Sequence, residues 1–87
     1  MQKIIIDEKG RKELATSVKK IIGQLNSVVS NIEHDNISGQ TFTQLLAVKG
    51  GASRICKDII SKGVLTQLDK YSKEEIDKAL DIIFKLG

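Results

Sequence analysis

The sequence predicts an all-α protein: a three-helix subunit built from a long antiparallel hairpin and a short third helix. Three observations predict this fold. Apolar residues recur at steps of three and four along most of the chain, capping residues stand where these patterns begin and end, and the 87 residues include no proline. Because no proline bars any segment from a helix, the breaks between helices must come from Gly, Asn and Asp.

The first helix is predicted from an apolar stripe whose steps alternate between four and three residues, as in a coiled-coil seam. The stripe consists of Leu14, Val18, Ile21, Leu25, Val28 and Ile32, and it is widened by Ile22 and Val29. We expect the helix to end at His34-Asp35-Asn36, and Ser38-Gly39 to form the turn and the cap of the next helix.

The second helix shows the same spacing and completes the hairpin. Its stripe consists of Leu45, Val48, Ala52, Ile55 and Ile59, flanked by Phe42, Cys56 and Ile60. The pattern predicts a helix that runs past Gly63 towards Leu68 and is joined to the first helix by a short loop.

The third helix is predicted to begin with a capping box, in which Ser72 and Glu75 satisfy each other's backbone amides. It then places Ile76, Leu80, Ile83 and Leu86 on one face. Each hairpin helix shields only one side of its neighbour, so we expect two hairpins to pair as a dimeric four-helix bundle. Residues 1–87 form one domain in this interpretation, with residues 1–8 as a flexible N-terminal arm.

Composition excludes several classes of protein. A single cysteine allows neither an internal disulfide nor a multi-thiolate zinc site within one chain, and it favours a cytoplasmic location. No apolar run approaches the roughly 18 residues of a membrane-spanning helix, and MQKIIIDEKG is too short an apolar start for a signal peptide. No nucleophile–base pair, phosphate loop or metal motif predicts catalysis, so neither enzymatic activity nor a cofactor is expected.

Basic residues are concentrated in the first two thirds of the chain. Residues 1–57 hold nine Lys and Arg against five Asp and Glu, whereas residues 58–87 hold five against six. Such asymmetry is typical of a nucleic-acid surface. Mixed charges that merely keep the helices soluble account for it equally well.

Gly23, Gly50 and Gly51 lie inside the predicted helices, although each destabilises a helix by up to about 1 kcal/mol relative to Ala. At about 100° per residue, we expect all three to point away from the hairpin seam. Lys12 and Lys19 share the outward side of the first helix, with Lys20 nearby. Arg54 and Lys57 lie outward on the second helix, with Lys49 on its flank. Long basic side chains beside glycine gaps would let a phosphate backbone approach, and a solvated face is the alternative.

Two runs carry a family resemblance: VKKIIGQL at residues 18–25 and FTQLLAVKGGA at residues 42–52. They resemble the CsoR/RcnR/FrmR family of bacterial repressors, which sense copper, nickel or cobalt, or formaldehyde. The resemblance spans residues 9–86. It implies helical subunits that form dimers, a pairing of dimers into tetramers, binding to operator DNA, and release of that DNA when the ligand binds.

The resemblance also assigns residues of the DNA surface. The basic family positions that contact DNA fall on Lys20 and Lys49, and a third such position, usually Arg, falls on Ser17. Charge and position on the predicted helices add Lys19 and Arg54 as candidates. Loss of one arginine weakens phosphate binding but need not abolish it, because an oligomer uses each contact repeatedly.

The sensor positions of the family are substituted in this chain. They fall on Ser38, Gly63 and Gln67, where the family has Cys, His, and His or Cys. A hydroxyl, a bare backbone and an amide are poor ligands for the metals that the family senses, and the thiol used for formaldehyde is absent as well. We therefore expect no metal site and no response to formaldehyde.

Cys56 is predicted to be a buried core thiol, and His34 a surface residue at a helix end.

The favoured function is a DNA-binding repressor, a homotetramer, that does not respond to metal or formaldehyde. The alternative is a helical interaction module, or a hetero-oligomer partner of a true sensor paralogue, that does not bind DNA itself.

Overall fold

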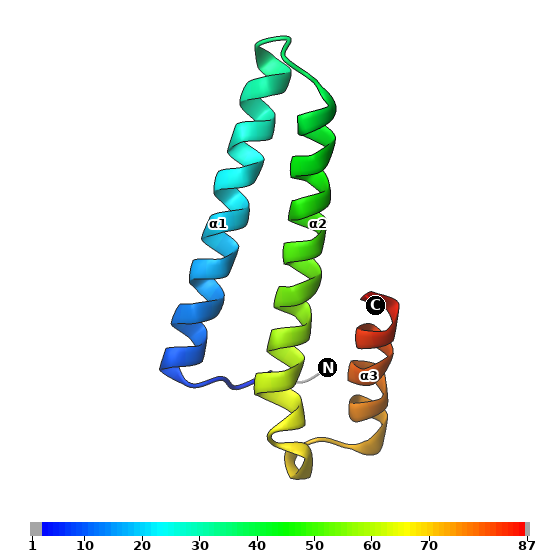
Figure 1. The fold of residues 1–87 in the computed structure, drawn as a ribbon. Helices are drawn as coiled ribbons and strands as arrows, with labels where there is room; N and C mark the ends of the chain where they lie inside the picture. Colours follow the sequence, from blue (N-terminus) through cyan, green and yellow to red (C-terminus); the bar gives the residue numbers. More distant parts are fainter. Residues whose placement is uncertain (1–2, 87) are drawn as a thin grey trace.

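The computed structural model describes residues 3–86 and has the order of helices that the sequence predicts (Figure 1). Its elements are α1 (Glu8–Glu33), α2 (Gly39–Ile59), the π-helical turn η1 (Ile60–Leu65), the 3-10 turn η2 (Leu68–Lys70) and α3 (Lys73–Leu86). α1 and α2 form the antiparallel hairpin, and α3 folds back beside the lower part of α2 (Figure 1). The predicted all-α, three-helix subunit is confirmed.

Side-chain caps fix the starts of all three helices. Asp7 caps α1, where its Oδ1 accepts from the Gly10 amide at 2.8 Å. Ser38 caps α2 in a capping box with Thr41. At α3 the Ser72 amide donates to Glu75 Oε1, and the Glu75 amide donates to Ser72 Oγ, both at 3.2 Å. The caps predicted at Ser38 and Ser72 are thus confirmed.

The turn between α1 and α2 lies where the sequence predicts it. His34 follows the last residue of α1 and is exposed, with Nδ1 2.7 Å from the Ser30 carbonyl oxygen. Asp35 adopts φ 54°, a left-handed conformation that a short polar side chain tolerates. The Asn36 amide then donates to the Asn31 carbonyl at 2.7 Å. The surface position expected for His34 is confirmed.

The compact apolar core of a protomer lies at the foot of the hairpin, around η1. Ile60, Val64 and Ala79 are buried there, and they are joined by the half-buried side chains of Ile4, Tyr71 and Ile83. The Tyr71 hydroxyl donates to the Gly63 carbonyl at 3.4 Å. The second helical segment passes Gly63 as predicted, but it ends in the wider π-helical turn. π-helical turns recur at functional sites.

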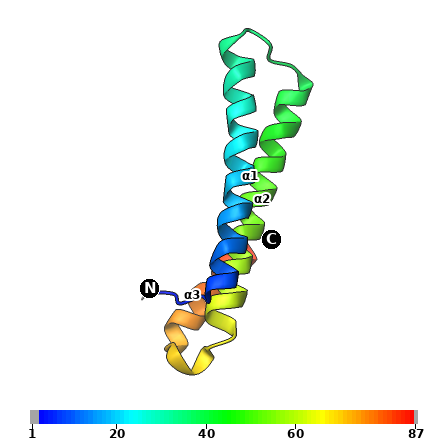
Figure 2. The same ribbon diagram turned by 90° about the vertical axis from the view of Figure 1, so that its left-hand side faces the viewer.

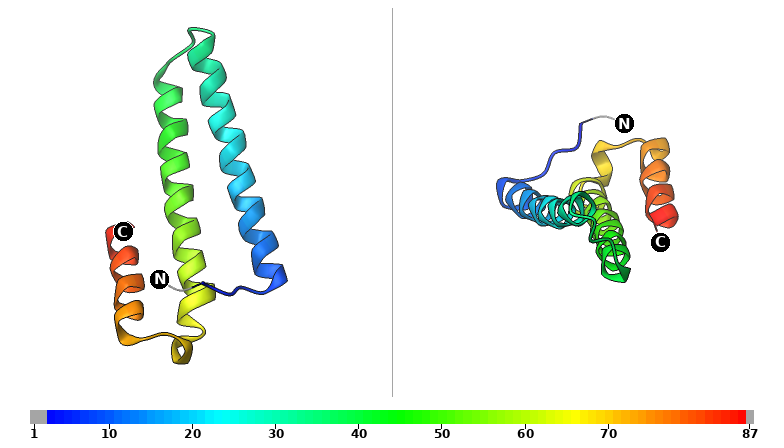
Figure 3. Two further views of the ribbon diagram at one scale, coloured as in Figure 1. Left: turned by 180° about the vertical axis from the view of Figure 1, so that it is seen from behind. Right: turned by 90° about the horizontal axis from the view of Figure 1, so that it is seen from above.

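Residues 3–7 form an extended segment that leads from the foot of α1 across to η1 (Figure 3). Ile4 packs against the core at the foot, and the Gln67 side-chain amide donates to the Ile5 carbonyl at 3.2 Å. Arg11 Nη1 donates to the Ile6 carbonyl at 2.6 Å. The segment therefore connects α1 with η1, and the flexibility expected of residues 1–8 stays a prediction.

A single protomer is long and thin (Figure 2). Its extents are 52 × 27 × 15 Å and its radius of gyration is 16.2 Å, against about 12 Å for a compact domain of this length. Its accessible surface of 6475 Å² exceeds that of a typical monomer of equal mass by about 1,400 Å². The hairpin thus leaves surface exposed that an ordinary monomer would bury.

Much of this exposed surface is apolar, and it follows the predicted stripes. Large apolar side chains are exposed on both hairpin helices, namely Val18, Ile22, Leu25, Val29, Ile32, Phe42, Leu45 and Leu46. On α3, Phe84 is 83% exposed. No helix of the described chain combines the length and apolar character that a bilayer crossing requires.

The predictions for Gly51 and Cys56 were wrong. A Cβ built on Gly51 would lie 3.3 Å from Ile21 Cδ1, so this glycine faces α1 at the hairpin contact rather than away from it. Gly23 and Gly50 do point into open space, since nothing lies within 4 Å of a Cβ at either position. Cys56 is exposed in the protomer, not buried.

We predict that Ser38→Ala lowers the free energy of unfolding by about 1 kcal/mol, because α2 loses the side chain that caps it. Urea denaturation followed by circular dichroism measures the change, at one protomer concentration because association itself adds stability. Ser61→Ala is the matched control, since Ser61 is exposed and lies inside a helical turn. Equal midpoints for the two variants would contradict a capping role for Ser38.

Candidate functional site

The hairpin has two unlike sides, because α1 and α2 touch along one edge of their apolar stripes. On α1, Val28 is 4% exposed whereas its neighbour Val29 is 49% exposed. Successive residues of a helix are about 100° apart, so Val29 faces the side of the hairpin that carries exposed apolar residues. Lys20 and Gln24 lie on the other side of the contact, here called the polar side because polar and charged side chains gather there.

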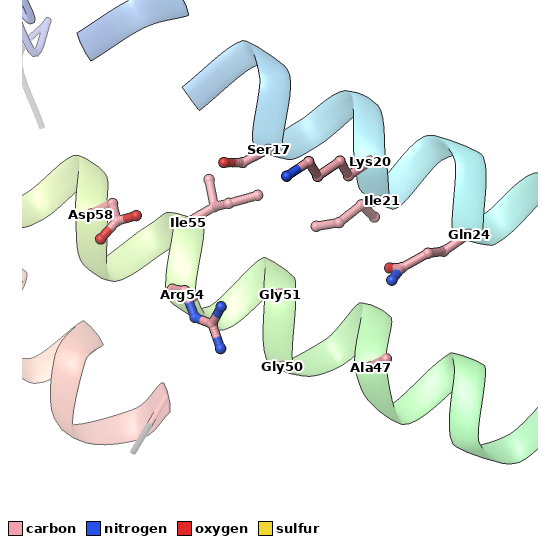
Figure 4. Close-up of a pocket in the computed structure, with 10 residues that line it drawn as sticks. All are labelled: Ser17, Lys20, Ile21, Gln24, Ala47, Gly50, Gly51, Arg54, Ile55 and Asp58. Carbon is pink, nitrogen blue, oxygen red and sulfur yellow. The ribbon is translucent and has the colours of Figure 1, made fainter. Parts of the chain in front are cut away.

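A groove of about 430 Å³ runs between α1 and α2 on this polar side (Figure 4). Its lining residues are Ser17, Lys20, Ile21 and Gln24 from α1, and Ala47, Gly50, Gly51, Arg54, Ile55 and Asp58 from α2. Small residues of α2 keep the groove open, and Gly50 has nothing within 4 Å of the place where a Cβ would stand. The glycines of the second helix therefore shape this groove.

Lys20 and Arg54 bring positive charge to the groove from the two helices (Figure 4). Both residues are exposed. Within residues 3–86 neither side chain forms an ion pair, whereas Lys12, Lys62 and Lys85 each pair with a carboxylate. Asp58 is the one carboxylate among the lining residues. Two cations are thus available to an anion that enters the groove.

A second hollow continues the groove towards the tip of the hairpin. It is lined by Lys20, Gly23, Gln24, Ser27, Gln40, Thr43, Gln44 and Ala47. Gln44 bridges the two helices here: its Nε2 donates to Ser27 Oγ at 3.4 Å, and its Oε1 accepts from Asn31 Nδ2 at 3.3 Å. Neutral amides and hydroxyls of this kind donate hydrogen bonds to phosphate oxygens in protein–DNA contacts.

The other two predicted DNA residues lie outside the groove. Lys19 is next to Lys20 and therefore about 100° from it around α1. Lys49 is about 140° from Arg54 around α2, on the side that carries Leu45. A single protomer thus brings together Lys20 and Arg54, and it does not bring Lys19 or Lys49 to the same groove.

Ser17 occupies the place in the groove where the family resemblance implies a basic residue. It is half-buried, and its hydroxyl donates to the Glu13 carbonyl of the same helix at 3.1 Å. It therefore carries no positive charge into the groove. The end of the groove near Ser17 and Asp58 is the less positive end.

The three substituted sensor positions lie at opposite ends of α2 and η1. Ser38 is at the tip of the hairpin, while Gly63 and Gln67 are at its foot. The 25 residues from Ser38 to Gly63 correspond to about 37 Å of helix. One protomer therefore does not bring the three positions together.

Each of these positions has a structural role of its own. Ser38 Oγ accepts from the Gln40 amide at 3.3 Å as the cap of α2. Gly63 is buried beneath Ile4, and the Gln67 amide holds the Ile5 carbonyl. In the chain from residue 3 to residue 86, no group of three His, Cys, Asp or Glu side chains lies close enough to hold a metal ion.

Sequence reasoning missed some residues of both regions. Gln24 and Gln44 were not predicted as groove residues. Gln24 is one helical turn from Lys20 and Gln44 is one helical turn from Ala47, so helical spacing could have placed them on the same face. The contacts of Ile4 and Ile5 were missed as well. Three consecutive isoleucines inside the predicted arm were the signal that the segment packs against the fold.

A match to a known family covers almost all of the hairpin and of α3. A family model described as metal-sensitive transcriptional repressor matches residues 10–85. Comparisons with curated proteins and with solved structures give no significant match. The family match covers nearly the entire chain and includes every groove residue, and the resemblance inferred from residues 18–25 and 42–52 is confirmed. The chain belongs to the metal-sensitive transcriptional repressor family.

Proposed function

We propose that this protein is a DNA-binding transcriptional repressor whose control no longer depends on a transition metal or formaldehyde. The observation that carries the proposal is the groove in which Lys20 and Arg54, unpaired with any carboxylate of residues 3–86, stand on an open, glycine-lined surface. The bound partner is operator DNA, and the protein acts in the cytoplasm without a cofactor.

The chemistry of the groove suits a phosphate backbone. Basic side chains that meet phosphates displace condensed counterions, and this release supplies much of the affinity for DNA. Gly50 and Ala47 let the backbone of a ligand approach α2 closely, while Gln24 adds an amide donor. Lys19 extends the positive surface beside Lys20, and a contact between Lys49 and DNA stays a prediction from the family resemblance.

The assembly we propose is a dimer of dimers. The surface that a protomer exposes in excess, about 1,400 Å², is of the size that one partner buries in an obligate interface. Pairing the exposed apolar sides of two hairpins, with Val29 and Leu45 at the contact, would bury it in a four-helix bundle. The groove lies on the opposite side and stays open to DNA.

The loss of metal and formaldehyde sensing is inferred from the residues at the sensor positions. Ser38 has a hydroxyl that caps a helix, Gly63 has no side chain, and the Gln67 amide is engaged with the Ile5 carbonyl. None of these groups matches the thiolate and imidazole donors that soft and borderline metals prefer.

One observation favours the alternative, an interaction module without DNA binding of its own. Ser17 adds no charge to the groove, and Asp58 adds a negative one at the same end, so the positive field is weaker there. In that case the exposed apolar side would pair with a sensor paralogue. Binding to the region upstream of the protein's own gene decides between the two functions.

We predict that Lys20→Ala and Arg54→Ala each weaken binding to this upstream DNA and flatten its salt dependence. The slope of log affinity against log salt should fall by about 0.9 for each phosphate that a variant no longer neutralises. Fluorescence anisotropy titrations at several salt concentrations measure both effects. Lys78→Ala, an exposed position on α3, is the matched control and should bind like the wild type.

Absence of any salt-sensitive, sequence-preferring complex in the wild-type protein would refute the repressor function and leave the interaction module. If both groove variants keep the wild-type slope of log affinity against log salt, Lys20 and Arg54 do not contact DNA. DNA binding by the protein itself would then still stand.

We predict that copper, zinc, nickel and formaldehyde neither bind stoichiometrically nor change the affinity for DNA, because the three sensor positions lack suitable donors. Metal content after incubation and desalting, measured by mass spectrometry, tests the first part, and anisotropy titrations with each compound test the second. One tightly bound metal per protomer would show that sensing is retained.

We predict that Leu25→Glu dissociates the assembly, because a carboxylate would be buried in the apolar contact between two hairpins. Sedimentation velocity should show a shift to lower mass. Asn26→Glu introduces the same charge on the next residue, which is exposed and about 100° away, and should leave the mass unchanged. An unchanged mass for Leu25→Glu would place the contact elsewhere.

A further inference from the structure

The segment of residues 3–7, here named the strap, is seated on bare backbone. A Cβ built on Gly63 would collide with Ile4 Cγ2, and it would lie 3.3 Å from Ile6 Cγ1. In Ile4 the Cγ2 methyl is attached directly to the β-carbon, so clearing the collision requires a new χ1 rotamer or a shift of the strap backbone. The absence of a side chain at Gly63 is therefore what lets the strap lie against η1.

The strap joins the feet of the two hairpin helices. At one end Asp7 caps α1 and Arg11 holds the Ile6 carbonyl. At the other end Ile4 lies on Gly63, and Gln67 holds the Ile5 carbonyl. The ion pair of Lys62 with Glu13, at 3.0 Å, crosses between η1 and α1 at the same level.

The groove proposed for DNA lies above these feet, on the same two helices. Ser17 lies ten residues beyond Asp7 on α1, and Arg54 lies nine residues before Gly63 on the continuous α2–η1 helix. Both helices are continuous between the feet and these residues, so a change in the spacing of the feet can be carried along them towards Lys20 and Arg54. The strap thus acts on the two groove cations through the helices that carry them.

No residue of the strap is fully buried. Ile5 is 60% exposed, and Lys3 and Asp7 are exposed as well. A hollow of about 450 Å³ lies beside it, lined by residues that include Ile6, Gly10, Lys62 and Gln67. Segments with few buried contacts open at a small fraction of the global unfolding free energy.

We propose that the strap is a built-in regulator of the groove: seated on Gly63 it holds the hairpin feet together and keeps the groove competent for DNA, and released it lowers the affinity for DNA. The proposal rests on the DNA-binding function proposed above. No external ligand is expected to bind at Gly63 or Gln67. In this proposal, residues of the chain itself control the affinity of the groove for DNA.

Gly63→Ala tests the proposal, because the added methyl group unseats Ile4. In the wild type, an NMR cross-relaxation signal between the Ile4 methyl and the Gly63 α-protons reports the seated strap. In Gly63→Ala we expect no such signal between Ile4 and the substituted residue. The affinity for the upstream DNA should fall about fivefold or more, the lower limit of typical coupling between sites.

A double variant separates the strap from a local disturbance of η1. Ile4→Ala removes the colliding methyl, so Gly63→Ala combined with Ile4→Ala should bind DNA more tightly than Gly63→Ala alone. Gly39→Ala is the matched control, since nothing lies within 4 Å of a Cβ at that position, and it should leave both the signal and the affinity unchanged.

Three results would overturn the proposal. They are an NMR signal from Ile4 that persists in Gly63→Ala, a signal that disappears while the affinity for DNA stays at the wild-type value, and a double variant that binds no better than Gly63→Ala. If the wild type itself binds no DNA, the proposed function fails, and the NMR signal still shows whether Gly63 is the seat of the strap.

Discussion

The contact of Ile60 and Val64 with Ala79 fixes the tertiary arrangement of a protomer, because it ties η1 to α3 at the foot of the hairpin. Above this foot, α1 and α2 touch along a narrow edge, where Val28 and Thr41 are buried. So little burial leaves the apolar stripes open over most of their width. Since apolar surface drives both folding and association, these open stripes support the proposed pairing of two hairpins.

The local features of the fold could be predicted because their causes are local. Ser38 and Ser72 start helices through hydrogen bonds to residues two or three positions away, and Asp35 lies in the turn between α1 and α2. The apolar stripes likewise follow from helical spacing alone. Of the groove, Lys20 and Arg54 were identified from charge, position and resemblance, and the structure places them on one surface.

The wrong predictions for Gly51 and Cys56 share one physical cause. Each apolar stripe has one edge that packs inside the hairpin and one edge that is exposed. The sequence does not show which of the two edges is packed. The hairpin contact uses the edge with Ile21, so Gly51 faces α1 although it lies far from the centre of the stripe. Cys56 lies on the other edge and is exposed. The packing of Ile4 on Gly63 joins residues too distant in the chain for any periodicity to reveal.

The two unlike sides of the hairpin have an evolutionary consequence. The residues that line the groove and the residues of the exposed apolar stripe alternate along the same helices, yet almost no position belongs to both. Substitutions on the groove side, such as a serine at position 17, can therefore accumulate without disturbing the apolar side. Under the proposed function, operator preference and quaternary structure can diverge at separate rates within one short gene, so a lineage can acquire new target genes while keeping its architecture.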